Sequence, residues 1–84
     1  EEEVTSIQRR KITLKMRIRE VWRKISEAAG QLVFEDLFID DRTRVEIVIT
    51  FLALLELMKM RRVKVRQKSS FGAIKIIPKQ EEQG

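Results

Sequence analysis

The chain has 84 residues, enough for one domain with one small hydrophobic core. It contains neither cysteine nor histidine, which excludes disulfides, thiolate metal sites and histidine-based catalysis, and we expect no metal or cofactor. Charged residues make up 37% of the chain and the formal net charge is +5, which permits a nucleic-acid partner without establishing one. Apolar runs are too short to span a membrane and no signal peptide is visible, so we expect a cytoplasmic protein with no membrane contact.

The two ends of the chain are polar and differ from the middle. The chain begins with three glutamates and no methionine, which is typical of a fragment cut from a longer protein. We expect a flexible lead-in over residues 1–11, a folded domain over residues 12–78 and a disordered tail over residues 79–84.

The first long helical pattern runs from Leu14 to Ala29. Thr13 is a suitable N-cap, because its hydroxyl accepts a hydrogen bond from a free backbone N–H, and Gly30 is suited to a left-handed helix end. The apolar positions have one-sided helical spacing: Leu14, Ile18, Val21, Trp22, Ile25 and Ala28. The opposite face is basic, with Lys15, Arg17, Arg19, Arg23 and Lys24. We expect Trp22 to lie in the core and the basic face to lie in solvent.

Short segments precede the second long helix. Residues 31–33 suit a brief strand or a packed turn, and residues 34–38 suit a helical stub that Asp40 and Asp41 end. Phe34, Leu37 and Phe38 share one side of this stub. Thr43 followed by Glu46 fits a capping box, which predicts a helix from there to about Met60.

The last part of the folded region predicts two strands. Residues 63–66 alternate valine with a basic residue, and residues 73–77 are rich in isoleucine. Residues 69–72 supply a turn between them, and Pro78 ends the second strand because it lacks an N–H donor. The order helix, short strand, helix, helix, strand, strand predicts an α+β winged helix, with a three-helix helix-turn-helix core and a short β-hairpin wing.

The second long helix is apolar nearly all round. Between Val45 and Met60 only Glu46, Thr50, Glu56 and Lys59 are polar. Such a helix is either wholly buried or has two covered faces, and so small a domain has little interior. We therefore expect something outside the domain to cover its second face.

Helical spacing divides that helix into two stripes. The stripe with the smaller residues is expected to face the core: Ile47, Thr50, Ala53, Leu54 and Leu57. The other stripe is the candidate docking site, flanked by charged residues at both ends: Arg44, Val48, Phe51, Leu52, Leu55 and Lys59. In the alternative, Phe51 is core and the exposed patch is formed by Val45, Ile49 and Leu52.

Several motifs together resemble the C-terminal domain of the prokaryotic kleisin ScpA, the segregation and condensation protein that binds SMC ATPases. These are residues 34–38 (FEDLF), 41–48 (DRTRVEIV), 50–60 (TFLALLELMKM), 63–67 (VKVRQ) and Phe71-Gly72 followed by Ile74. The resemblance covers about residues 12–77, and the FLALLEL run is its more specific part.

The resemblance implies a winged helix that docks on the cap side of one SMC ATPase head, helping to close a ring that acts in chromosome condensation and segregation. It implies that the apolar face of the third helix, with Phe51 and Leu55, meets the head. The accessory protein ScpB would bind through regions absent from this chain, DNA would be contacted only indirectly or weakly, and the protein would be nucleoid-associated. Any ATP hydrolysis would belong to the SMC partner.

Three other functions remain as alternatives. A DNA-binding winged helix would use the basic wing (Arg61, Arg62, Lys64, Arg66 and Lys68) and the first helix, although the expected recognition face is apolar and a solvated charged face explains the same pattern. An enzyme is disfavoured, because Glu35, Asp36, Asp40 and Asp41 have spacings typical of turns, and Ser69 and Ser70 have no histidine to activate them. Self-association through the apolar patch is the third.

Overall fold

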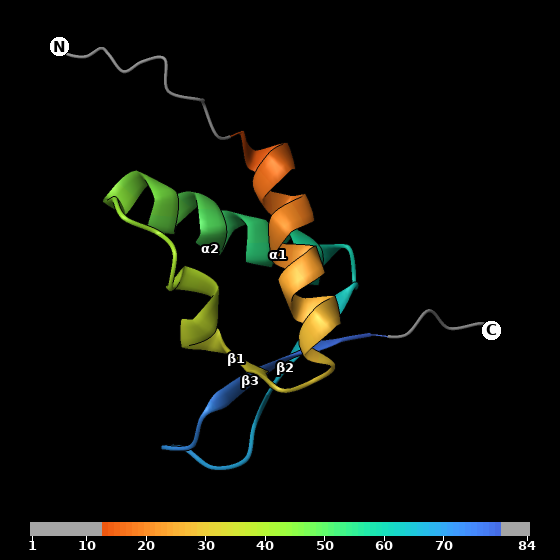
Figure 1. The fold of residues 1–84 in the computed structure, drawn as a ribbon. Helices are drawn as coiled ribbons and strands as arrows, with labels where there is room; N and C mark the ends of the chain where they lie inside the picture. The colour runs from red at the N-terminus through yellow and green to blue at the C-terminus, as the bar shows by residue number, and fades with distance from the viewer. Residues whose placement is uncertain (1–12, 80–84) are drawn as a thin grey trace, which may run out of the picture.

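The computed structural model describes residues 13–79, so the predicted lead-in over residues 1–11 and residues 80–84 of the predicted tail lie outside the described residues. The elements in chain order are α1 (Leu14–Ala28), β1 (Leu32–Val33), the 3-10 helix η1 (Phe34–Phe38), α2 (Arg44–Lys59), β2 (Val63–Gln67) and β3 (Ile74–Pro78) (Figure 1). This confirms the predicted α+β winged-helix fold. The middle helix of the predicted three is one short 3-10 segment, and the predicted third helix is α2.

Both α-helices begin at threonine caps. The Thr13 hydroxyl accepts from the Met16 N–H at 3.1 Å, and the Thr43 hydroxyl accepts from the Glu46 N–H at 3.1 Å. The Glu46 carboxylate accepts from the N–H of Arg42 at 2.7 Å, one residue earlier than in the predicted capping box.

The end of α1 has an unusual backbone. Gly30 has a φ of 88°, as its predicted place after the helix requires, but Ala29 before it is also left-handed, with a φ of 49°. An alanine pays a steric penalty there that glycine does not. The helix therefore ends at Ala28, one residue earlier than predicted.

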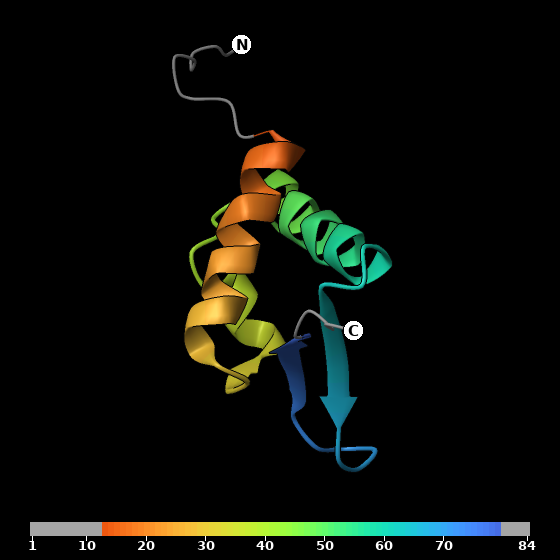
Figure 2. The same ribbon diagram turned by 90° about the vertical axis from the view of Figure 1, so that its right-hand side faces the viewer.

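The strands form one antiparallel sheet in the order β1-β3-β2. Residues 32–33 are therefore a true strand, which pairs with β3 and adds a third strand to the predicted two-stranded hairpin. Figure 2 shows the β2–β3 hairpin projecting away from the two helices. At its tip, the Gln67 amide donates to the Gly72 carbonyl at 2.9 Å and the Gly72 N–H donates to the Ser69 carbonyl at 3.0 Å. These bonds hold the turn in a defined shape.

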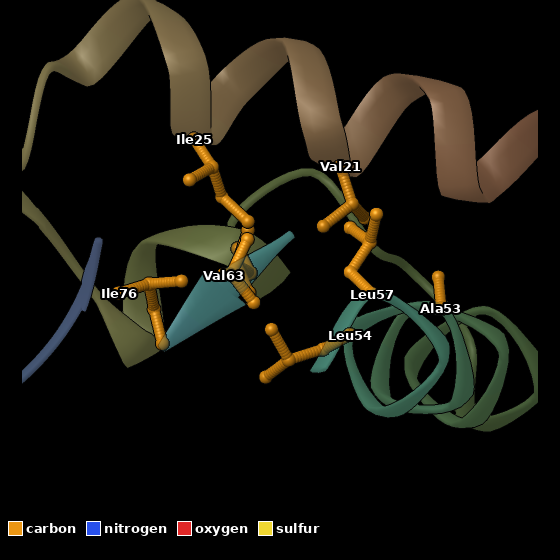
Figure 3. Close-up of a cluster of buried hydrophobic side chains, with 8 residues drawn as sticks. Val21, Ile25, Ala53, Leu54, Leu57, Val63 and Ile76 are labelled. Atoms are coloured by element: carbon orange, nitrogen blue, oxygen red, sulfur yellow. The ribbon is translucent and has the colours of Figure 1, made fainter. Parts of the chain in front are cut away.

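The core lies between α1, α2 and the inner face of the sheet (Figure 3). Its buried hydrophobic residues are Val21, Ile25, Leu37, Ala53, Leu54, Leu57, Val63 and Ile76. Every element except β1 contributes one or more of them, and Leu32 of β1 packs against the cluster from its edge. Leu14, which the helical spacing placed on the buried side of α1, is exposed because it lies at the first turn, outside this cluster.

Arg17 is buried, so its predicted place on the solvent face of α1 is wrong. Its Nη1 donates to the Asp41 carboxylate at 2.9 Å and to the Thr50 hydroxyl at 3.2 Å. The Asp41 side chain is 1% exposed and that of Arg17 is 10% exposed, so the two charges neutralise each other away from solvent. The pair joins α1 to the loop that precedes α2.

Trp22 is half-buried and packs against the core, and the Arg62 guanidinium lies 4.5 Å from its ring centroid. We expect Trp22→Ala to lower the free energy of unfolding by about 2–3 kcal/mol, less than the roughly 3–5 kcal/mol typical of a fully enclosed aromatic residue. Urea unfolding followed by circular dichroism measures the change. A midpoint equal to that of the wild-type chain would show that the ring adds nothing to the core.

Candidate functional site

The inner stripe of α2 largely matches the prediction. Thr50, Ala53, Leu54 and Leu57 are buried. Ile47 was predicted to be core but is exposed. It lies near the start of α2, where it lines a hollow together with Phe34 and Phe38 of η1. The prediction was wrong because helical spacing gives the direction of a side chain but not how far the neighbouring elements extend.

The outer stripe of α2 is uncovered within the domain. Phe51 and Leu55 are each 42% exposed, and Val48 and Leu52 are exposed as well. We call these four residues the α2 apolar face. In the alternative patch, Val45 is also exposed and Ile49 is half-buried, but Phe51 is not enclosed as that alternative required. The unpartnered surface therefore includes the predicted stripe and extends to Val45.

Two aromatic residues of η1 extend the α2 apolar face, and the sequence reasoning did not include them. Phe34 packs edge-on against Phe38 at 5.1 Å and against Phe51 at 6.5 Å between ring centroids. Together with α2 they form an open hollow of about 460 Å³. Within residues 13–79 its lining is hydrophobic: Phe34, Phe38, Ile47, Val48 and Phe51. The sequence did place the rings of Phe34 and Phe38 on one side of η1. It did not show that this side borders α2.

Charged residues stand at both ends of the α2 apolar face. Arg44 is the first residue of α2 and Lys59 is the last, and both are exposed. The Lys59 Nζ lies 3.7 Å from a carboxylate oxygen of Glu56, an exposed pair of the kind that contributes little to stability. An apolar centre with a charged margin is the composition of protein–protein interfaces.

Three of the four acidic residues considered for catalysis make structural contacts, and the fourth, Glu35, is exposed. Asp36 accepts from the Val33 N–H at 3.1 Å at the start of η1, Asp41 pairs with Arg17, and Asp40 lies 3.4 Å from the Lys24 Nζ. Within residues 13–79 no three acidic side chains come together as a potential metal site. In the same part of the chain no helix has the length and apolar composition to cross a membrane.

The domain is a winged helix whose longest helix carries an uncovered apolar face, a feature typical of protein interaction surfaces. The family described as Segregation and condensation protein ScpA matches residues 1–78. Segregation and condensation protein A of Bacillus cereus (strain ATCC 10987 / NRS 248) is 36% identical over 70 residues, 83% of this chain and 28% of that relative. The same values hold for Segregation and condensation protein A of Bacillus anthracis (strain CDC 684 / NRRL 3495). The chain therefore belongs to the ScpA family, as its motifs indicated, and spans 28% of the length of these relatives.

Proposed function

We propose that this chain is the part of a kleisin that docks on the cap side of an SMC ATPase head through the α2 apolar face. In doing so it helps to close the SMC–kleisin ring in chromosome condensation and segregation. The observation that carries the proposal is the exposure of Phe51 and Leu55, one helical turn apart, beside an entirely hydrophobic hollow. Membership of the ScpA family supports it.

The size of the face suits a stable complex. Complete burial of an exposed large side chain contributes roughly 1.5–3 kcal/mol. Because these four are already about half buried, binding would gain about 3–5 kcal/mol from them, which is comparable with the lower estimates of the cost of association. Phe51 is the expected centre of the binding energy, because its ring is already held edge-on by Phe34 and loses little freedom on binding. Arg44 and Lys59 favour a partner surface with acidic groups at its margin.

The role proposed for this chain is binding without catalysis. The ATP-hydrolysing groups would belong to the SMC head, and ScpB would be bound by segments of the full-length protein outside this chain. The protein would act in the cytoplasm at the nucleoid. Sequence reading by α2, as in DNA-binding winged helices, is not supported, because the exposed face of α2 offers hydrocarbon where base edges need hydrogen-bonding groups.

Light scattering distinguishes docking from self-association. We expect the 84-residue chain to be a monomer that forms a one-to-one complex with a purified SMC head from the same organism. A dimer that persists when excess head is added would mean that the α2 apolar face pairs with its own copy, and the docking proposal would be lost.

A further inference from the structure

The outer face of the sheet, which points away from the core, is basic. In the β2–β3 register, Val65 lies opposite the buried Ile76, whereas Arg66 lies opposite Lys75. Because side chains alternate between the faces of a strand, Arg66 and Lys75 both leave the sheet on the side away from the core. Like charges directly opposite each other on a sheet destabilise the pairing, so local folding gives no reason for this arrangement.

A hollow of about 450 Å³ lies on this outer face. It is lined by three cationic residues and by five residues without charge: Arg66, Lys68, Lys75, Gly30, Gln31, Gly72, Ala73 and Ile77. Within residues 13–79, none of the ion pairs involves any of its three cations. Among residues 13–79, therefore, the lining of the hollow concentrates positive charge and includes no acidic residue.

The surrounding chain has the same character. Between Glu56 and Glu81 the sequence has eight basic residues and no acidic one: Lys59, Arg61, Arg62, Lys64, Arg66, Lys68, Lys75 and Lys79. A surface of one sign focuses the electrostatic field and attracts a polyanion. Residues 13–60, in contrast, carry eight basic and eight acidic residues, although α1 has exposed cations at Lys15, Arg19 and Arg23. The imbalance of charge is a property of the wing.

The tip of the hairpin carries a fully exposed aromatic ring. Phe71 is 99% exposed, the highest value among the exposed large hydrophobic residues of the described chain. The turn that carries it is fixed by the two bonds to Gly72 described above. Phe71 directly precedes Gly72, which lines the basic hollow. Apolar side chains that enter a groove while neighbouring cations contact phosphates are a known arrangement in DNA binding.

We propose that Arg66, Lys68, Lys75 and Phe71, here called the wing face, bind double-stranded DNA through its sugar–phosphate backbone without sequence preference. The cations of the hollow contact phosphates, and the Phe71 ring lies in a groove of the duplex. The phosphates of DNA are regularly spaced anions and can neutralise both Arg66 and Lys75 at once. A single acidic side chain of a protein partner would neutralise only one of the two. The binding goes beyond the docking proposed above.

The wing face is separate from the α2 apolar face. In both ribbon views α2 lies in the upper half of the molecule and the tip of the hairpin lies at the bottom (Figures 1 and 2). No residue lines both hollows. A protein bound to α2 would therefore leave the wing free to contact DNA.

Fluorescence anisotropy with a labelled duplex at several salt concentrations tests the proposal on the 84-residue chain. We expect R66Q/K68Q/K75Q to weaken binding at least about tenfold at low salt and to reduce the slope of log affinity against log salt by about 2.7, since three phosphate contacts are lost. The matched control K15Q/R19Q/R23Q removes the same charge from the exposed face of α1 and should change both values little. Equal losses in the two triple variants would mean diffuse attraction by net charge and would overturn the proposal.

Two single variants separate the parts of the wing face. Phe71→Ser should weaken binding about tenfold with an unchanged salt slope, because the ring contributes no charge. Lys75→Glu should weaken binding while raising the melting temperature by about 2–4 °C, because it replaces a repulsive cross-strand pair by an attractive one. A wild-type chain that bound polyglutamate as tightly as DNA, or that bound neither, would contradict the assignment.

Discussion

Phe51→Arg and Leu55→Arg are each expected to weaken binding to an SMC ATPase head by at least about 100-fold while leaving a cooperatively folded monomer. Removing either side chain, 42% exposed in the free chain, forfeits about 1 kcal/mol of apolar burial on binding, and the larger cost comes from the new guanidinium, which would have to be buried without a partner. A loss of about 3 kcal/mol in binding free energy corresponds to a roughly 100-fold loss of affinity. Folding should survive because both side chains are 42% exposed, so arginine has a route to solvent in the free chain.

Isothermal titration of a purified SMC head with each variant measures the effect, and circular dichroism checks that the variants fold. Phe71→Arg is the matched control, because it makes the same change at an exposed phenylalanine at the tip of the hairpin, away from α2. It should bind the head with wild-type affinity. Wild-type affinity in Phe51→Arg, or equal weakening in all three variants, would remove the α2 apolar face as the docking site.

Features set by neighbouring residues in the chain were predictable. The caps at Thr13 and Thr43, both strands of the hairpin and the exposed stripe of α2 follow from patterns within one element. The exposed stripe could be predicted because α2 has more apolar residues than a small core can bury. Helical spacing alone assigns these residues to an inner and an outer stripe. The capping box differs from the prediction in one partner, because the Glu46 carboxylate accepts from the N–H of Arg42 and the spacing of Thr43 and Glu46 in the sequence does not reveal this choice.

Features that depend on contacts between distant segments were not predictable. Arg17 looks like one more cation on a basic face, and its partners Asp41 and Thr50 lie 24 and 33 residues away. The contribution of Phe34 to the candidate site depends on how closely η1 approaches α2, which no pattern within η1 reveals. The Arg66–Lys75 pair requires the strand register, and a shift of one residue would move these side chains to the opposite face.

The Arg17–Asp41 pair is the basis of the second large effect. Asp41→Ala removes the carboxylate and leaves a guanidinium, 10% exposed, whose remaining partners are the Thr50 hydroxyl and the half-exposed Glu20 carboxylate, 3.5 Å from the Arg17 Nε. Breaking a buried ion pair from one side destabilises a protein by roughly 3–5 kcal/mol. Because the whole free energy of unfolding of such a domain is about 5–15 kcal/mol, we expect Asp41→Ala to be marginally folded at room temperature. Urea unfolding followed by Trp22 fluorescence measures the loss.

Asp40→Ala is the matched control, since it makes the same truncation one residue earlier, at an exposed carboxylate near Lys24. Its unfolding midpoint should hardly move, because exposed ion pairs contribute little. The double variant R17M/D41A should regain part of the lost stability, since methionine fills space near the core without bringing a charge. If the double variant is less stable than Asp41→Ala alone, Arg17 stabilises the fold through its contacts with Thr50 and Glu20, and the guanidinium left by Asp41→Ala is not an uncompensated charge. The buried charge on α1 would then not be what holds the loop before α2 in place.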